Sequence, residues 1–372
     1  GGNSVSENVG VKHLLNIKTV AERRENMLWF RAPEKVYFKK GSLPVALAEL
    51  KKYKKAFIVT DTFLYQNGYT KPVKEQLDAM GITHTAFYNV APDPTLACAR
   101  EGAEAMTAFR PDLIIAVGGG SAMDAAKIMW VLYEHPDADF EDMAMRFVDI
   151  RKRVYGFPKM GEKAYFVAIP TTAGAGSETT VAAVITDSAT HRKASINDPV
   201  LIPKYAVLDP ALTVDLPPHT TAITGMDALA HAVEAYTNHT YNTKLENRLA
   251  KESVRLIYHN ILTAFADGSN LEARQNMQRA AFYAGRAFTR GCVGYVHAIG
   301  HTLGGLYGVA HGLAMAVLLP HVMKEFGASA HKRLAELADV CGIGGRNDAE
   351  KANAFIRWIE ETNAKMGLPD KF

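Results

Sequence analysis

An aspartate and a histidine in the second half of the chain have a spacing that suits metal binding. Asp227 and His231 are four residues apart in a segment with helical periodicity, so their side chains face the same way. An aspartate oxygen and an imidazole nitrogen together suit Fe(II), Zn(II), Co(II) or Mn(II). The same spacing also occurs in ordinary salt bridges and between neighbours on a helix surface, so this pair needs further ligands before it predicts a metal site.

Further candidate ligands follow in an apolar segment, where His297, His301 and His311 fall within fifteen residues. A buried histidine needs a hydrogen-bond partner or a metal, so core filling does not explain three of them. A straight helix would separate His297 from His311 by about 21 Å, so the two can share a metal only if the chain reverses between them. Three glycines are expected to supply that reversal: Gly304, Gly305 and Gly308. The sequence therefore predicts one shared divalent-metal site.

A run of three glycines and a serine, at residues 118–121, separates an apolar strand pattern at 112–117 from a helical pattern at 122–133. Glycines let backbone N–H groups approach a phosphate closely, and a helix N-terminus adds partial positive charge. Asp124, in the first helical turn, would cap the helix or contact a ribose. The pattern predicts a pyrophosphate site, although it is not the G-x-G-x-x-G fingerprint, and the alternative is a tight turn without a ligand.

Two other segments follow predicted strands and complete a candidate nucleotide site. Asp61 ends the strand pattern at 56–61, where a carboxylate can accept from a ribose 2′-OH and would repel a 2′-phosphate, which favours NAD over NADP. The alternative is that Asp61 caps the next helix. The turn at 170–178 carries Thr171, Thr172 and two glycines after another strand. Because open α/β sheets bind ligands at the carboxyl ends of their strands, these segments are expected to line one crevice.

Strands and helices alternate in the first half of the chain, whereas the second half is helical. Strands are predicted at residues 35–39, 56–61, 83–90, 112–117 and 165–169, and helices at 70–80, 95–109, 122–133, 220–237, 244–266, 271–289, 311–326 and 349–366. Such alternation predicts a parallel sheet covered on both faces. We expect an α/β domain at residues 1–205 and an all-helical domain at 206–372.

Composition and charge narrow the functional classes. The 372 residues are 48% hydrophobic and 22% charged, which is typical of a globular protein. The net charge of +3, from 42 basic and 39 acidic residues, indicates no nucleic-acid partner. No stretch approaches the ~18 consecutive apolar residues of a membrane span, and no signal-peptide core begins the chain. Because Cys98, Cys292 and Cys341 also fit no disulfide framework, a cytoplasmic protein without a membrane partner is expected.

Together these motifs resemble the iron-containing (group III) alcohol dehydrogenase family. The resemblance runs in order over essentially the whole chain, through residues 118–124, 170–178 and 225–231 and the histidines up to His311-Gly312. It looks closest to the alcohol dehydrogenase domain of bifunctional aldehyde–alcohol dehydrogenases, a likeness carried by residues 25–29, 123–136 and 149–160. The aldehyde dehydrogenase half of those proteins is absent from this chain, which favours a free-standing enzyme with one activity.

The resemblance implies a dehydroquinate synthase-like architecture, with an N-terminal dinucleotide-binding α/β domain, an all-α C-terminal domain and the active site between them. It implies NAD(H) and Fe²⁺, or Zn²⁺ in some members, and a homodimer, since relatives are often dimers. The implied metal ligands are Asp227, His231, His297 and His311. His301 matches a histidine near the nicotinamide that is assigned to proton relay. The positions that match dinucleotide contacts are Asp61, Gly118, Gly119, Gly120, Ser121, Asp124, Thr171, Thr172 and Lys193.

Two departures from the family pattern bear on function. The second turn has Ala175 where many members have a threonine, so a hydroxyl toward the cofactor is missing. Arg286 and Arg290 flank Phe288 in a segment that usually lines the substrate side of the site. Because a guanidinium binds carboxylate, sulfonate or phosphate through two hydrogen bonds, Arg290, with Arg286, is a candidate for binding an anionic substrate. The alternative is that both arginines pair with surface acids or with a partner subunit.

The expected function is that of a metal-dependent, NAD(H)-linked alcohol dehydrogenase or aldehyde reductase, which transfers hydride to or from a short-chain primary alcohol or aldehyde. An alternative is a reductase specific for an anionic aldehyde, such as a semialdehyde or sulfoacetaldehyde. The zinc relatives of this architecture, glycerol dehydrogenase and dehydroquinate synthase, fit the metal motifs less well. A metal-dependent hydrolase leaves the glycine turn and Asp61 unexplained, and a non-catalytic sensor requires an effector module that the sequence does not show.

Overall fold

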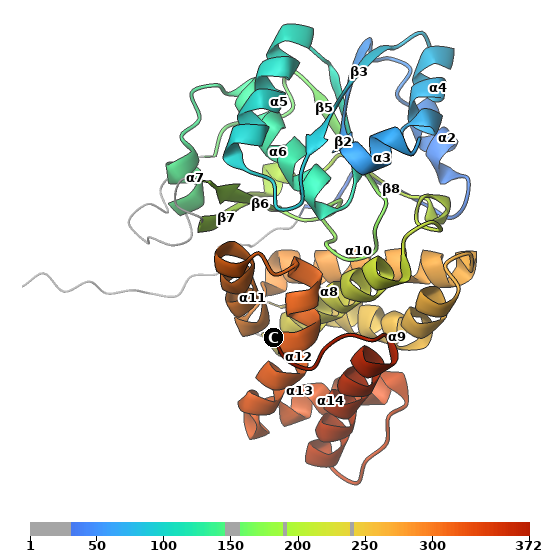
Figure 1. The fold of residues 1–372 in the computed structure, drawn as a ribbon, viewed down its shortest axis with the longest axis vertical. Helices are drawn as coiled ribbons and strands as arrows, with labels where there is room; N and C mark the ends of the chain where they lie inside the picture. The colour runs from blue at the N-terminus through green and yellow to red at the C-terminus, as the bar shows by residue number, and fades with distance from the viewer. Residues whose placement is uncertain (1–30, 146–156, 189–191, 239–241) are drawn as a thin grey trace, which may run out of the picture.

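The chain forms a sheet-containing layer and a helical layer that meet along the site predicted from the sequence (Figure 1). The structure is a computed structural model that describes residues 31–145, 157–188, 192–238 and 242–372. Residues 25–29 and 149–156, which carry part of the closer family resemblance, lie outside the described residues. In the described ranges, no helix combines the length and the apolar composition needed to cross a membrane.

Six parallel strands make the main sheet, in the order β1-β8-β5-β4-β2-β3. The strands are β1 (Lys35–Phe38), β2 (Lys55–Asp61), β3 (Thr83–Val90), β4 (Leu113–Gly118), β5 (Tyr165–Pro170) and β8 (Tyr205–Leu208). The α/β fold class expected from the sequence is confirmed. The short strand β8 was not predicted, and it pairs with β1 and β5. The change from strands to helices therefore falls between Leu208 and Pro218, a few residues after the expected boundary at 205.

Helices cover both faces of this sheet because successive strand residues point to opposite sides. In β4, Ile114 and Ala116 pack under α5 (Leu96–Phe109) and α6 (Gly120–Glu134). The alternate residues Leu113, Ile115 and Val117 pack under α2 and α4 on the other face. The bounds of the helices near that second face are α2 (Ser42–Ala48), α3 (Thr62–Gln66) and α4 (Lys71–Ala79). Fully apolar strands such as β4 are thus explained by burial on two sides.

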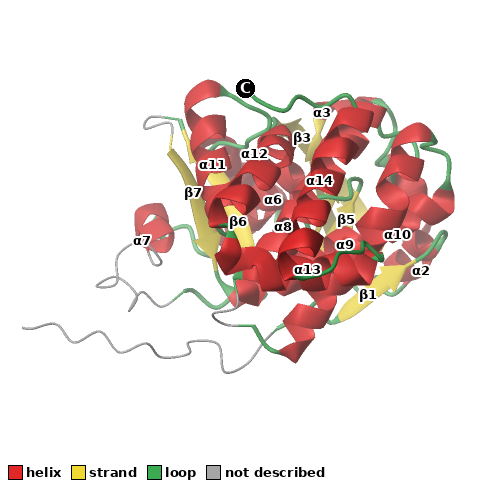
Figure 2. Cartoon of the chain, turned by 90° about the horizontal axis from the view of Figure 1, so that it is seen from below, coloured by secondary structure: helices red, strands yellow, loops and turns green. Residues whose placement is uncertain are grey.

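An antiparallel hairpin that the sequence analysis did not predict extends from this layer toward the helices. It consists of β6 (Ala182–Asp187) and β7 (Arg192–Asn197), and α7 (Phe140–Met145) lies nearby. Residues 181–185 form an apolar run that fits a strand, but the sequence analysis did not assign it. Strand β7 contacts α11 of the helical layer, and Figure 2 shows the two elements side by side.

The second layer is helical throughout its described residues, as expected. Its helices are α8 (Pro218–Thr237), α9 (Lys244–Ala266), α10 (Leu271–Gly291), α11 (Tyr295–Tyr307), α12 (His311–Phe326), α13 (Ala328–Cys341) and α14 (Asp348–Lys365). Helices α11 and α13 were not assigned from the sequence. Helix α8 is central, since it packs against α9, α10 and α12 and fourteen of its residues are buried.

The chain reverses between His297 and His311, as expected. Only one of the three glycines predicted to cause this reversal lies at the break. Gly304 and Gly305 lie inside α11, which continues to Tyr307. Gly308 caps this helix in the left-handed conformation, with φ 68°, and α12 begins three residues later at His311. A left-handed residue ends a helix with little strain only when it lacks a Cβ, so Gly308 alone supplies the break.

Gly312 allows the start of α12 to approach the backbone of α8. A Cβ at Gly312 would lie 2.5 Å from the carbonyl oxygen of Ile223, and backbone cannot move aside as a flexible side chain can. We expect Gly312→Ala to lower the free energy of unfolding by about 1–3 kcal/mol and to reduce metal occupancy, because it displaces His311. Urea unfolding and metal analysis measure both effects. Gly344→Ala, at a position with nothing within 4 Å, is the control, and equal behaviour of the two variants would contradict this prediction.

Candidate metal centre and nucleotide-binding turns

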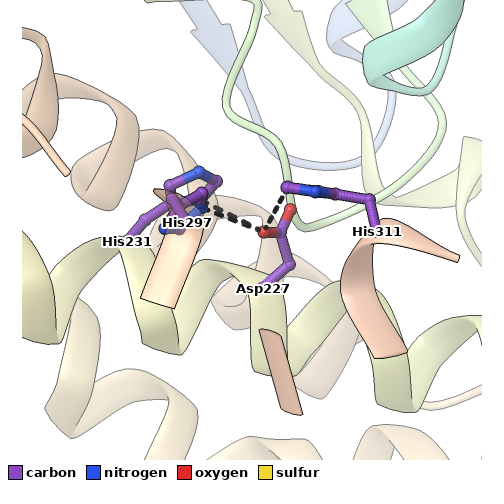
Figure 3. Close-up of side chains that lie close together, drawn as sticks. All are labelled: Asp227, His231, His297 and His311. Carbon is purple, nitrogen blue, oxygen red and sulfur yellow. Dashed lines mark ion pairs between the residues drawn. The ribbon is translucent and has the colours of Figure 1, made fainter. Parts of the chain in front are cut away.

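Four side chains from three helices converge on one point (Figure 3). Asp227 and His231 come from successive turns of α8, His297 lies in the first turn of α11, and His311 is the first residue of α12. One potential ligand atom from each residue lies within 4.8 Å of the other three. The structure thus brings together all four residues that the family resemblance implies as metal ligands.

The separations between these atoms suit an ion better than direct hydrogen bonds. The Oδ1 atom of Asp227 is 3.7 Å from His231 Nδ1, 3.6 Å from His297 Nε2 and 3.3 Å from His311 Nε2. A tetrahedron with metal–ligand bonds of ~2.1 Å has edges of ~3.4 Å, whereas a hydrogen bond would bring the atoms to ~2.9 Å. The first three of these atoms are buried and have no hydrogen-bond partner among the described residues. Because buried polar atoms are normally satisfied, this arrangement fits a divalent cation.

The protonation states of Asp227 and His231 also suit metal binding. Burial raises the pKa of Asp227, but the neighbouring His231 and His311 outweigh it, so the pKa falls well below its usual value. Burial lowers the pKa of His231 to about 3, which leaves that ring neutral. An ionised carboxylate and a neutral imidazole are the forms that bind metals. The side chain of His311 is 30% exposed, while the other three are at most 7% exposed, so the open side of the group lies at His311.

Glu234 supports this group and was missed by the sequence analysis. One of its carboxylate oxygens pairs with His297 Nδ1, and the other accepts a hydrogen bond of 2.7 Å from Val296 N. Although burial lowers the pKa of His297, the neighbouring carboxylates of Asp227 and Glu234 raise it to about 9. A carboxylate on Nδ1 fixes the ring so that Nε2 faces the metal. The available signal was spacing, because Glu234 follows Asp227 by seven residues and His231 by three, on one face of α8.

Two aromatic rings border the four ligands. Phe288 stacks on His231, with ring centroids 4.3 Å apart and an interplanar angle of 21°. The ring of His301 lies 5.1 Å from that of His311 and 5.9 Å from that of His297, but His301 is not part of the converging group. Burial lowers the pKa of His301 to about 3, and the nearby His311 and His297 add to this effect. His301 is therefore a neutral ring beside the open side of the site.

The two glycine turns lie at neighbouring strand ends and pack against each other. β4 ends at Gly118 and β5 ends at Pro170, and these residues are paired in the sheet. A Cβ on Gly119 would lie 3.3 Å from the side chain of Thr172, and one on Gly120 would lie 2.7 Å from the Cβ of Ala175. The glycines are therefore needed for close packing of the two turns. Ser121 and Thr171 belong to the same two turns, and Thr171 N donates to Gly118 O over 3.0 Å.

The second turn also joins the two layers beside the metal ligands. A Cβ on Gly174 would lie 2.7 Å from the carbonyl oxygen of Thr224, three residues before Asp227 on α8. A Cβ on Gly176, which has φ 67°, would lie 3.0 Å from the carbonyl oxygen of Ala281 on α10. The turn at 170–178 thus touches the helix that carries two of the metal ligands.

Asp61 and Lys193 both have protein partners in this structure. Asp61 Oδ1 accepts a hydrogen bond of 2.8 Å from Leu64 N and caps α3, which was the alternative considered for it, while Oδ2 has no such partner among the described residues. Lys193 Nζ pairs with Asp93 Oδ1 at 2.6 Å. The same ammonium group reaches α11, because a Cβ on Gly304 would lie 3.0 Å from it. Lys193 therefore lies where the hairpin meets the helix that carries two histidines of the site.

The carboxylate of Asp124 is directed toward the protein. Oδ1 accepts a hydrogen bond of 2.6 Å from Ser177 Oγ, and Oδ2 accepts one of 2.9 Å from Val184 N. Each oxygen thus has a partner that the sequence analysis did not foresee, one in the second turn and one in β6.

Arg286 and Arg290 leave α10 on a different face from Phe288. Each arginine is two residues from Phe288 on α10, and a helix turns by about 200° over two residues. Both arginines therefore face away from the ring that stacks on His231. Burial lowers the pKa of Arg286, and Glu246 in the first turn of α9 counteracts it. This placement favours the structural alternative for the two arginines.

The role of Glu234 leads to a prediction about metal affinity. Glu234→Gln keeps the side-chain size but cannot supply two anionic oxygens to His297 and Val296, so we expect metal affinity to fall about 10–100-fold with the fold retained. Metal competition titration followed by elemental analysis measures the change. Glu246→Gln is a matched control, because this buried glutamate belongs to a capping box in which glutamine also functions. Unchanged affinity in Glu234→Gln would show that the carboxylate does not support the site.

Comparison with known proteins agrees with these features. Residues 33–210 match the family model described as iron-containing alcohol dehydrogenase, and residues 221–372 match the model for the C-terminal part of the Fe-containing alcohol dehydrogenase family. The chain is 44% identical over 389 aligned residues to the bifunctional aldehyde-alcohol dehydrogenase AdhE of Escherichia coli (strain K12). That match covers 99% of this chain and 44% of the relative, so the chain spans less than half the length of that protein.

Two further relatives are similar over most of their own length. The NADPH-dependent butanol dehydrogenase of Clostridium saccharobutylicum is 36% identical, over 92% of this chain and 85% of the relative. A crystal structure of a 1,3-propanediol oxidoreductase superposes with a TM-score of 0.84 at 34% identity, covering 92% of this chain and 88% of that one. With both family models matched in order and the metal ligands convergent, the chain belongs to the iron-containing alcohol dehydrogenase family.

Proposed function

We propose that this chain is a metal-dependent, NAD(H)-linked alcohol dehydrogenase that interconverts short-chain primary alcohols and aldehydes. The convergence of four potential ligand atoms, three of them buried without a hydrogen-bond partner among the described residues, beside two glycine turns is the observation that carries the proposal. Asp227, His231, His297 and His311 would hold Fe²⁺, with Zn²⁺ as the alternative. The groups proposed to hold the dinucleotide are Asp61, Gly118, Gly119, Gly120, Ser121, Thr171, Thr172 and Lys193, whereas both carboxylate oxygens of Asp124 are bonded to the protein.

The bound groups would supply Lewis-acid polarisation of a substrate oxygen and exchange of a hydride. The chain's own residues orient the reactants and exclude water. Asp227 brings negative charge to the cation, Glu234 holds the ring of His297, and Phe288 forms an apolar wall against His231. We assign proton relay to His301, because its ring lies beside that of His311, on the partly exposed side of the site.

The surroundings of the ligands favour an uncharged substrate. Phe288 presents an aromatic face near His231, while Arg286 and Arg290 lie on the opposite side of α10. A hydrolase would need the metal ligands but not two glycine turns packed against each other, one of which also packs against α8. A redox enzyme that binds a dinucleotide next to the metal accounts for both features.

An aldehyde panel tests this proposal. Protein reconstituted anaerobically with Fe(II) is expected to oxidise NADH with propanal and glycolaldehyde at least ~10-fold more efficiently than with succinic semialdehyde and sulfoacetaldehyde, a difference of ~1.4 kcal/mol in transition-state binding. Zn(II)-loaded protein and NADPH are run in parallel. A preference for the anionic aldehydes that Arg290→Ala abolishes would return the arginines to the substrate site. No oxidation of NADH with either metal would contradict the proposed activity and reopen the hydrolase and sensor alternatives.

Asp61 allows a test of the cofactor preference. Asparagine also caps helices, so Asp61→Asn keeps the hydrogen bond to Leu64 N while removing the charge. We expect this variant to bind NADPH about tenfold more tightly than the unmodified chain does, because repulsion of the 2′-phosphate is relieved, and to bind NADH more weakly. Quenching of protein fluorescence measures both dissociation constants. Asp78→Asn, on the surface of α4, controls for net charge. An equal response of the two variants would remove Asp61 from the cofactor site.

A further inference from the structure

A lysine with no role in the proposed chemistry is completely buried next to the two glycine turns. Lys127 lies on α6, seven residues after the start of the helix at Gly120, and has no exposed surface. Its ammonium group donates to the carbonyl oxygens of Thr180 and Ala182 at 2.9 and 2.8 Å, and lies 3.4 Å from the Thr180 hydroxyl. An ammonium group has three donors, and here all three are directed to one short segment. Burying a charge is costly, so this position needs an explanation.

Asp124 holds the same segment from the previous turn of α6. Its two oxygens accept from Ser177 Oγ and Val184 N, and its position three residues before Lys127 places both side chains on one face of the helix. Glu178 is also buried, and its charge and that of Asp124 counteract the effect of burial, which lowers the pKa of Lys127 to about 8. Asp124 and Lys127 therefore both hold this segment by hydrogen bonds, and Glu178 is buried in the same region.

The segment that these residues hold connects the parts of the candidate nucleotide site. Residues 177–184 leave the second glycine turn and enter β6, and β6 pairs with β7, which carries Lys193. Helix α6 itself begins at the first glycine turn and continues directly from it. Its side chains also hold the second turn and the start of the hairpin, through hydrogen bonds to Ser177, Thr180, Ala182 and Val184.

We propose that Lys127 and Asp124 are positioning residues for the dinucleotide: they tie the second turn and the β6–β7 hairpin to the N-terminal part of α6, so that the binding site is formed before the ligand arrives. Neither side chain contacts the ligand in this arrangement, and Asp124 acts through Ser177 and Val184. The inference rests on the proposed function, because the ligand is NAD(H). A site formed in advance binds more tightly, since less ordering remains to be done on binding.

The test uses the full chain loaded with metal. Lys127→Met has a similar length but cannot donate a hydrogen bond, and it is expected to raise the dissociation constant for NADH at least ~10-fold. The KM for NADH rises with it, whereas kcat at saturating NADH and the metal content stay within about twofold of the unmodified chain. Lys163→Met is the matched control, because Lys163 donates to Tyr133 O over 2.8 Å near the other end of α6. This control is expected to leave NADH affinity unchanged.

Amide hydrogen exchange without the cofactor gives a second readout that does not depend on activity. Lys127→Met should speed exchange at residues 177–187 about tenfold or more while leaving α8 unchanged, and Lys163→Met should not. If Lys127→Met does not fold, Ser177→Ala removes only the bond to Asp124, and the same two effects are expected at about threefold. The proposal is overturned if the variant that folds binds NADH as tightly as the unmodified chain and its amide exchange at residues 177–187 is unchanged.

The two levels of inference fail in different ways. If the unmodified chain does not bind NADH at all, the proposed function fails, and the exchange data still decide whether Lys127 holds residues 177–187. If the unmodified chain binds NADH and Lys127→Met loses affinity only in proportion to lost metal and lost overall stability, the role is merely structural and the positioning proposal is wrong.

Discussion

Burial of the Asp227 carboxylate among three imidazoles is the constraint to which most of the helical layer conforms. A buried charge without compensation is costly, and Asp227 Oδ1 has no hydrogen-bond partner among the described residues. The three rings come from α8, α11 and α12, so these helices must meet within a few ångströms of one another. Glu234 fixes the ring of His297, and the lack of a side chain at Gly312 lets α12 reach α8. Electrostatics and close backbone packing therefore produce one site.

The same central helix connects the metal ligands to the sheet layer. The second glycine turn touches α8 near Thr224, and it packs against the first turn at the end of the neighbouring strand. Gly174 and Gly120 have no room for a side chain at these contacts, because an added Cβ would lie 2.7 Å from the carbonyl oxygen of Thr224 or from the Cβ of Ala175. A change in either turn would therefore alter the position of the turns relative to the metal ligands. This coupling explains how two layers with separate hydrophobic cores present one continuous site.

Two buried charged groups stabilise the region in different ways. At the metal group, unsatisfied atoms face one another at distances that suit a cation, so this group is incomplete without an ion. At the cluster of Asp124, Lys127 and Glu178, the hydrogen bonds of Asp124 and Lys127 are made to the protein itself. The first arrangement is that of a binding site, and the second is that of a structural support. Both groups are buried, so burial does not distinguish a binding site from a structural support. The two differ in whether their polar atoms have hydrogen-bond partners in the protein.

The sequence by itself determined the parallel sheet and most of the helices, because these depend on apolar periodicity. Local spacing gave Asp227, His231 and three histidines as candidate ligands, and the family resemblance selected the four side chains that converge. The sequence did not reveal Glu234, which looks like any helical glutamate until His297 is placed against it from 63 residues away. Nor did it show that Gly304 lies within a helix, since this depends on where α11 ends. The short strands β7 and β8 were also missed. Contacts between distant segments decided these points, and local sequence patterns carry no record of them.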